Sequence, residues 1–238
     1  MGPLPSGREI PAVASAAIPV ERAAFIRRTY AHLGGAVLAF ALLEIAIFQT
    51  TLPEAIVSLL GTSQFSWLIV MGAFIGVSWL ARSWAASDTS LKLQYAGLAT
   101  YVVAESLIFV PMLWMASEYA GAATIQSAAL LSLMLFTGLT VSVFATQRDF
   151  SRMSSILCVG GFVALGLIIC SVLFGFQLGV MFSAAMILFA AGCILYDTSN
   201  ILLRYRTDQH VAASLSLFAS VALLFWYVLR LLMNLRED

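Results

Sequence analysis

Seven long apolar stretches dominate this sequence and constrain its fold more than any other feature. Of the 238 residues, 61% are hydrophobic and only 10% are charged, whereas a soluble domain usually carries about 25% charged residues. Each stretch is long enough to cross a bilayer, and each crossing must be helical because lipid offers no partner for a backbone amide. The sequence therefore predicts an all-α polytopic membrane protein, folded as a seven-transmembrane-helix bundle.

The predicted spans are separated by short polar segments. They run over Thr29–Gln49, Phe65–Trp84, Tyr95–Ala116, Ile125–Thr146, Met153–Phe174, Leu178–Leu203 and Val211–Asn234. Residues 50–64 are expected to form a short interfacial helix or a loop. Residues 1–23 hold four prolines and no long apolar run, so we expect a mobile cytoplasmic N-terminal tail ahead of a transmembrane domain at residues 24–238.

Basic residues give the predicted orientation. Arginines precede the first span, and the loops after the second, fourth and sixth spans each contain Arg or Lys. The loops after the first, third and fifth spans contain neither. This alternation follows the positive-inside rule with a cytoplasmic N-terminus. Seven spans then put the C-terminus outside, although Arg230 and Arg236 weaken that end of the argument.

Several function classes lack the residues they need. The formal net charge is zero, so no nucleic-acid partner is expected. The two histidines, His32 and His210, are too few for a seven-helix zinc hydrolase and too shallow for an intramembrane serine protease. A retinal protein needs a lysine in its last span, and the lone lysine here, Lys92, lies in a loop. We predict no enzyme activity and no cofactor. The cysteines lie in apolar runs without metal-ligand spacing, at Cys158, Cys170 and Cys193.

Two acids fall inside the predicted spans far from the basic loops. A charge at the bilayer centre costs at least ~2.5–3.5 kcal/mol, so an intramembrane acid is a functional candidate by default. Glu105 is the deepest, and Pro111 removes a helix amide six residues later. This pair indicates either a kinked, water-lined ion site or a protonated glutamate bonded to a neighbouring helix. Glu44, near the outer end of the first span, is expected to reach the lipid headgroups.

A third acid, Asp197, lies in the segment ILYDTSN near the predicted cytoplasmic end of span six. Arg82, Arg204 and Arg206 lie on the same side. The two interpretations are a structural salt bridge or hydrogen bond, and a titratable gate or ion ligand. In span two, Gly72 and Gly76 have a spacing that allows close helix approach, which we expect to serve packing within the bundle, with dimerisation as the alternative.

Three further segments are distinctive: ILYDTSNIL, the segment FATQRDFSRMSSIL after span four, and the last span ending in FWYVLRLL. Together they resemble the Bax inhibitor-1 family of seven-helix membrane proteins, and its bacterial YccA-like branch in particular. The resemblance covers roughly residues 24 to 236. It implies a bundle in which the seventh helix is surrounded by the other six, and it makes a bacterial inner membrane the expected location.

The resemblance implies one of two roles. Some members look like pH-sensitive calcium leak channels, in which two aspartates on spans six and seven share a proton. Asp197 matches the first aspartate, but Ser220 stands where the second would be, so a shared proton is not available. Asp197 could still ionise against Arg82 or Arg206. Glu105 matches no family carboxylate.

The YccA-like branch instead resembles a substrate and modulator of a membrane-bound AAA protease, engaged through the N-terminal tail. Two hypotheses therefore stand. The first is a protein that modulates a membrane protease or the stress response through protein interaction. The second is a calcium or cation leak channel, controlled by protons at a gate around Asp197. A transporter is a weaker third, because no inverted repeat is evident.

Overall fold

The computed structural model describes residues 12–63, 65–87 and 90–237. Within these ranges the chain is helical and contains seven helices long and apolar enough to cross a membrane, which confirms the predicted fold class. The spanning helices are α1 (Pro19–Ile47), α3 (Ser66–Ala85), α4 (Leu91–Met115), α5 (Ala122–Thr146), α6 (Met153–Phe174), α7 (Val180–Leu203) and α8 (His210–Glu237). The short helix α2 (Leu52–Leu60) fills the predicted interfacial segment.

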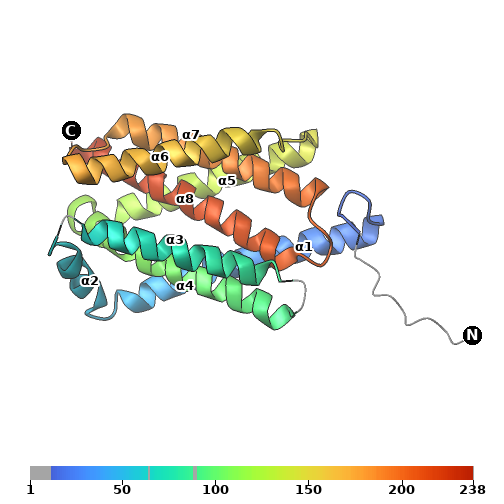
Figure 1. Ribbon diagram of the computed structural model, residues 1–238, viewed down its shortest axis with the longest axis horizontal. Coiled ribbons are helices and arrows are strands. Elements are labelled where there is room, and N and C mark those ends of the chain that lie inside the picture. Colours follow the sequence, from blue (N-terminus) through green and yellow to red (C-terminus); the bar gives the residue numbers. More distant parts are fainter. Residues whose placement is uncertain (1–11, 64, 88–89, 238) are drawn as a thin grey trace, which may run out of the picture.

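Helix α8 lies at the centre of the bundle, between α5–α7 on one side and α1, α3 and α4 on the other (Figure 1). In the apolar stretch of α8, 61% of the residues are buried by protein, against 6% in the apolar stretch of α6. Five of the other six spanning helices pack closely against α8, whereas α6 packs chiefly against α7. The family resemblance implied that six helices surround the last one. In the structure five helices surround α8, and α6 lies outside this ring.

Local chemistry explains where the helices begin and end. Helix α1 starts at Pro19, ten residues before the predicted span, because a proline at the first helical position and Glu21 in the first turn favour a helix outside the lipid. The hydroxyl of Ser90 accepts from the amide of Leu93 and caps α4. Helix α4 continues through Pro111, then widens into the π-helical turn η1 (Ala116–Ala120), and Gly121 ends it with φ of 77°.

Helices α3 and α4 approach closely at Gly97. A Cβ at this position would lie 2.5 Å from the carbonyl oxygen of Ala81 and 2.6 Å from the amide nitrogen of Ala85. Gly72 and Gly76 do not make this kind of contact, since a Cβ at either would meet no atom within 4 Å. The prediction that these two glycines pack within the bundle is therefore wrong: they lie on a face that no neighbouring helix covers.

The ends of the bundle differ in charge. We call the basic end the one at which α1, α4, α6 and α8 begin and α3, α5 and α7 end. Most of the described basic residues lie there: Arg22, Arg27, Arg28, Arg82, Lys92, Arg148, Arg152, Arg204 and Arg206. Arg230 and Arg236 lie toward the other end, where their guanidinium groups donate to the backbone carbonyls of Leu178 and Ala120.

Candidate functional site

Asp197 is held between α7 and α8 by two serine hydroxyls. Ser216 donates to one carboxylate oxygen over 2.9 Å, and Ser220 donates to the other over 2.6 Å. The two serines are four residues apart on α8 and so lie on one face of that helix. Asp197 is only 8% exposed. We call these three residues the Asp197 cluster; its two hydrogen bonds tie α7 to the central helix.

The Asp197 cluster borders a cavity of about 360 Å³, which we call the Asp197 cavity. Residues from four helices line it, among them Arg82 of α3, Ser154 and Cys158 of α6, and Cys193 of α7. Serine, thiol, arginine and carboxylate groups therefore surround one space inside the membrane-spanning region. Such a space can hold water or a small ion, because it offers both donors and acceptors.

Arg82 is the cation of this site. Its guanidinium carbon lies 5.3 Å from the centroid of the Tyr101 ring, a cation–π arrangement. From there it acts electrostatically on both Asp197 and Glu105. Within residues 12–63, 65–87 and 90–237, no arginine or lysine forms an ion pair with Asp197. The close contact at Gly97 fixes the part of α3 that carries Arg82.

The structure does not bring Arg206 to Asp197. The guanidinium of Arg206 binds Asp208 with two hydrogen bonds of 3.1 Å and 3.0 Å. The backbone of Arg206 also forms an isolated β-bridge with Val13, in the segment that precedes α1. Arg206 is therefore part of the α7–α8 loop, and Arg82 is the arginine that reaches the Asp197 cavity.

Glu105 lies inside the bundle, 6% exposed, one helical turn after Tyr101 on α4. One of its carboxylate oxygens, Oε2, is buried and has no hydrogen-bond partner. Glu105 does not line the Asp197 cavity. The two acids therefore share the influence of Arg82 but occupy different surroundings.

Glu44 does not reach the headgroups, so that expectation is wrong. Its side chain is 7% exposed, and both carboxylate oxygens are buried without hydrogen-bond partners. Glu44 continues the stripe of α1 that packs into the bundle, after Leu33, Ala36 and Phe40 at intervals of three or four residues. Its position on this stripe, rather than its height in the span, decides its burial.

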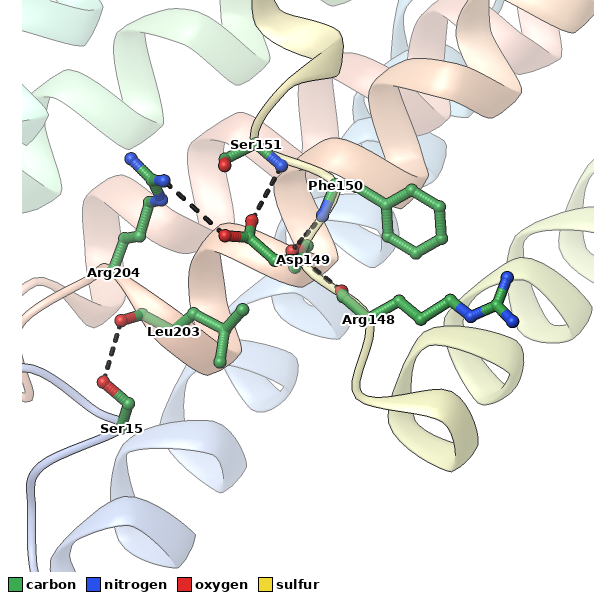
Figure 2. A network of polar contacts seen from close by, with 8 residues as sticks. Ser15, Arg148, Asp149, Phe150, Ser151, Leu203 and Arg204 are labelled. Carbon is green, nitrogen blue, oxygen red and sulfur yellow. Dashed lines mark hydrogen bonds and ion pairs between the residues drawn. The ribbon is translucent and has the colours of Figure 1, made fainter.

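The segment RDFS and the segment YDTSN meet at the basic end (Figure 2). The hydroxyl of Ser199 accepts from the amide of Phe150 over 3.0 Å and donates to the carbonyl of Arg148 over 3.3 Å. Ser199 is two residues after Asp197, so the loop after α5 is anchored on the helix that carries the candidate gate.

The neighbouring Asp149 extends this contact. Its carboxylate accepts from the backbone amide of Ser151 over 2.8 Å and lies 3.8 Å from a guanidinium nitrogen of Arg204 (Figure 2). These contacts, the amide of Ser151 first, hold the pKa of Asp149 below its ordinary value. Asp149 is exposed, so the contact fixes the loop more than it stabilises the fold.

A family model for inhibitors of apoptosis-promoting Bax1 matches residues 22–237. The chain belongs to the Bax inhibitor family. It is 27% identical to Bax inhibitor 1 of Schizosaccharomyces pombe over 227 residues, which cover 91% of this chain and 79% of that protein. It is 34% identical to an uncharacterized protein of Pseudomonas aeruginosa over 114 residues, and 30% identical to a Golgi anti-apoptotic protein of vaccinia virus over 113 residues.

The last two matches are partial. They cover 47% and 45% of this chain and span 50% and 46% of the length of those relatives. No solved structure matches the chain. The resemblance to the Bax inhibitor-1 family is therefore confirmed, and the family supplies a context for the Asp197 cluster rather than a function.

Ser220, which the family match placed opposite Asp197, donates directly to that carboxylate in the structure. Ser216, Cys158 and Cys193 were missed. Ser216 could have been found, since it lies one turn before Ser220 on the same helix face. The two cysteines gave no signal, because an apolar run does not reveal which side faces a cavity. No group of three or more His, Cys, Asp or Glu side chains arranged to hold a metal occurs among the residues that the structure describes.

Proposed function

We propose that this protein is a proton-controlled cation leak pathway whose gate is the Asp197 cluster. The observation that carries the proposal is a buried acid on the wall of a polar cavity, bonded on both oxygens to the central helix. A charged acid inside a membrane costs free energy, and such residues usually mark functional sites.

The gating step follows from hydrogen-bond chemistry. An ionised carboxylate only accepts, so it can receive both serine hydroxyls and hold α7 against α8. A protonated carboxyl group has one oxygen that carries a donating O–H and accepts more weakly than a carboxylate oxygen, so the hydrogen bond from one of the two serines weakens or reverses. Protonation of Asp197 therefore loosens the contact between α7 and α8 beside the cavity, without a second aspartate.

Arg82 sets the charge of the pathway. While Asp197 is ionised, the arginine and the acid nearly cancel, and the cavity offers little attraction to a cation. Calcium or another cation could pass only where Arg82 stays on Tyr101 rather than in the open space. The cation class comes from the resemblance to the calcium leak members of the family, since the charges of the cavity do not select a cation.

The test is flux into liposomes that contain the purified protein and a calcium indicator. Wild type should pass calcium faster at acid than at neutral pH, and Asp197→Asn should remove that pH dependence. Glu118→Gln is the matched control, because Glu118 is an exposed acid in the turn η1, at the opposite end of the bundle from the Asp197 cluster. Flux no higher than in empty vesicles at every pH between these values would end the proposal.

A second candidate function is modulation of a membrane protease through the N-terminal tail, a role tied to stress response. It is supported by the way residues 12–15 attach to the α7–α8 loop. The amide of Ala14 donates to the carbonyl of Tyr205 over 2.8 Å, and the hydroxyl of Ser15 donates to the carbonyl of Leu203 over 2.9 Å (Figure 2). Residues 1–11, about half of the expected tail at residues 1–23, lie outside the described residues.

A membrane-bound AAA protease that pulls on this tail would therefore pull on the loop that follows the Asp197 helix. Deletion of residues 1–11 should abolish co-purification with the protease while leaving the docked segment in place. Ser15→Ala is the comparison, since it removes one docking bond and keeps the tail. Unchanged association and turnover after the deletion would exclude this role.

We also propose that the basic end faces the cytoplasm of a bacterial cell, with the protein in the inner membrane. The positive-inside rule supports this orientation. The two arginines at the other end do not oppose it strongly, because Arg230 and Arg236 donate to backbone carbonyls of neighbouring segments. Fusions of a cytoplasmic reporter to the loop after α5 and to the loop after α6 should give opposite signals.

A further inference from the structure

A second cavity, unrelated to the Asp197 cluster, lies between α1 and α4. Its volume is about 520 Å³, and its walls are almost entirely apolar. Small side chains form most of the α1 wall, at Ala31, Gly35, Ala36 and Ala39. Several of these residues are exposed on the outer surface of the bundle, so the cavity is a groove that opens toward lipid.

The length of the groove matches one leaflet of a bilayer. On α1 it extends from Ala31 to Leu43, and twelve residues of helix rise by about 18 Å. The hydrocarbon core of a bilayer is about 30 Å thick, so one leaflet accounts for about half of it. The groove therefore begins at the basic end and runs toward the middle of the membrane, as an acyl chain does.

The shallow end of the groove is polar. The Nδ1 group of His32 lies 2.6 Å from the carbonyl of Arg28 and donates to it, which leaves Nε2 to accept from the hydroxyl of Tyr95 over 3.0 Å. This bond links α1 to α4 across the mouth of the groove. The centroid of the His210 ring, at the start of α8, lies 5.0 Å from the centroid of the His32 ring, so His210 is also close to the mouth of the groove.

Two cations flank this mouth. Arg28 is one helical turn before His32, and Lys92 is three residues before Tyr95, so each shares a helix face with a mouth residue. Both are exposed. Basic residues at the mouth of a groove between membrane helices complement a lipid phosphate, and the ring of Tyr95 is an aromatic side chain of the kind that gathers at the level of the headgroups.

We propose that this groove binds one anionic phospholipid, with an acyl chain between α1 and α4 and the phosphate at Arg28 and Lys92. The surrounding bilayer is as apolar as the groove, so apolarity alone selects nothing. The shape made by the small residues holds the chain, and the two cations select the negative headgroup.

The first test fills the groove. A Cβ at Gly35 would meet no atom within 4 Å, and Gly35 lines the groove, so the leucine of Gly35→Leu should occupy it. Gly138→Leu is the matched control, because Gly138 on α5 is equally open and lies outside the groove. Native mass spectrometry of the full chain, released from nanodiscs of equal phosphatidylglycerol and phosphatidylcholine, then counts the retained lipid.

Wild type and Gly138→Leu should retain about one phosphatidylglycerol per protein, and Gly35→Leu should retain at least fivefold less. Equal retention by Gly35→Leu and wild type would overturn the groove as the site. Equal loss in both leucine variants would also overturn it, because the loss would then not depend on the groove.

The second test addresses the headgroup. The double variant Arg28→Gln, Lys92→Gln should still retain a lipid but should lose the preference for phosphatidylglycerol over phosphatidylcholine. If wild type retains both lipids equally, or the double variant keeps the preference, the assignment of the phosphate to these residues is wrong. Neither result depends on cation flux, so the proposal stands or fails separately from the gate.

Discussion

Asp197 and Glu105 are both buried acids within reach of one arginine, yet their surroundings differ. Asp197 receives a hydroxyl on each oxygen and borders a cavity. Glu105 has a buried oxygen without a partner and does not border that cavity. The difference indicates that burial alone does not identify a gate; the hydrogen bonds that join two helices at Asp197 do.

The largest expected effect comes from the contact that fixes Arg82 near both acids. In Gly97→Ala the new methyl group would meet backbone atoms of α3, which cannot rotate away. Overpacking usually costs about 1–3 kcal/mol, and this contact lies at or above the upper end of that range because backbone atoms would have to move. The midpoint of thermal unfolding in detergent should fall clearly. Gly76→Ala is the control and should not lower it, because a Cβ at Gly76 meets nothing within 4 Å.

Ser220→Ala should destabilise the protein less, and for a different reason. It leaves one oxygen of the buried Asp197 without its 2.6 Å donor, a loss of about 1–3 kcal/mol. Unfolding by a denaturing detergent measures it. Ser171→Ala provides the comparison, since Ser171 only donates to the carbonyl of Ile168 on its own helix. If both variants unfold at the same detergent fraction as wild type, the Asp197 cluster does not hold α7 to α8.

Glu105→Gln should lower the free energy of unfolding by less than about 1 kcal/mol, or should raise it, because a buried carboxyl group without a full set of partners is costly. The same unfolding assay applies, and Glu44→Gln should behave alike, since both oxygens of Glu44 lack partners. A loss as large as that of Ser220→Ala would mean that Glu105 has a bond as important as those of Asp197, and the contrast between the two acids would disappear.

Asp149→Asn should give the smallest effect, confined to low pH. Because the pKa of Asp149 is lowered in the folded protein, its contribution is present above the ordinary aspartate pKa of about 3.9. That contribution is lost as the pH falls through the lowered value. The variant should therefore match the stability of wild type at pH 2 and lie slightly below it at neutral pH. A larger deficit at pH 2 than at neutral pH would contradict this sign.

Much of the fold could be predicted because apolar length and loop charge are local signals. The seven spans followed from them. For residues 50–64 they allowed a short helix or a loop, and the structure has the helix α2 there. The start of α1 at Pro19 did not follow, because its first turns extend beyond the lipid and hydropathy does not detect them. Matching the last span to the family placed Ser220 opposite Asp197, and the two side chains are hydrogen-bonded in the structure. The errors at Glu44, Gly72 and Gly76 share one cause. Each depends on which face of a helix meets a neighbour, and helices that are apolar all round do not reveal this.

The central claim is that protonation of Asp197 loosens the wall of the Asp197 cavity, and Cys193 in that wall can report on it. Cys158 and Cys170, both free thiols, are first replaced by serine. The rate at which a water-soluble methanethiosulfonate reagent modifies Cys193 is then measured in liposomes at acid and neutral pH. The same protein with Asp197→Asn, measured at each pH, corrects for the thiol's own dependence on pH. We predict that the rate of Cys193 modification in the protein that keeps Asp197, divided by the rate in the Asp197→Asn protein, rises severalfold from neutral to acid pH. A ratio that stays constant across this range would contradict the account.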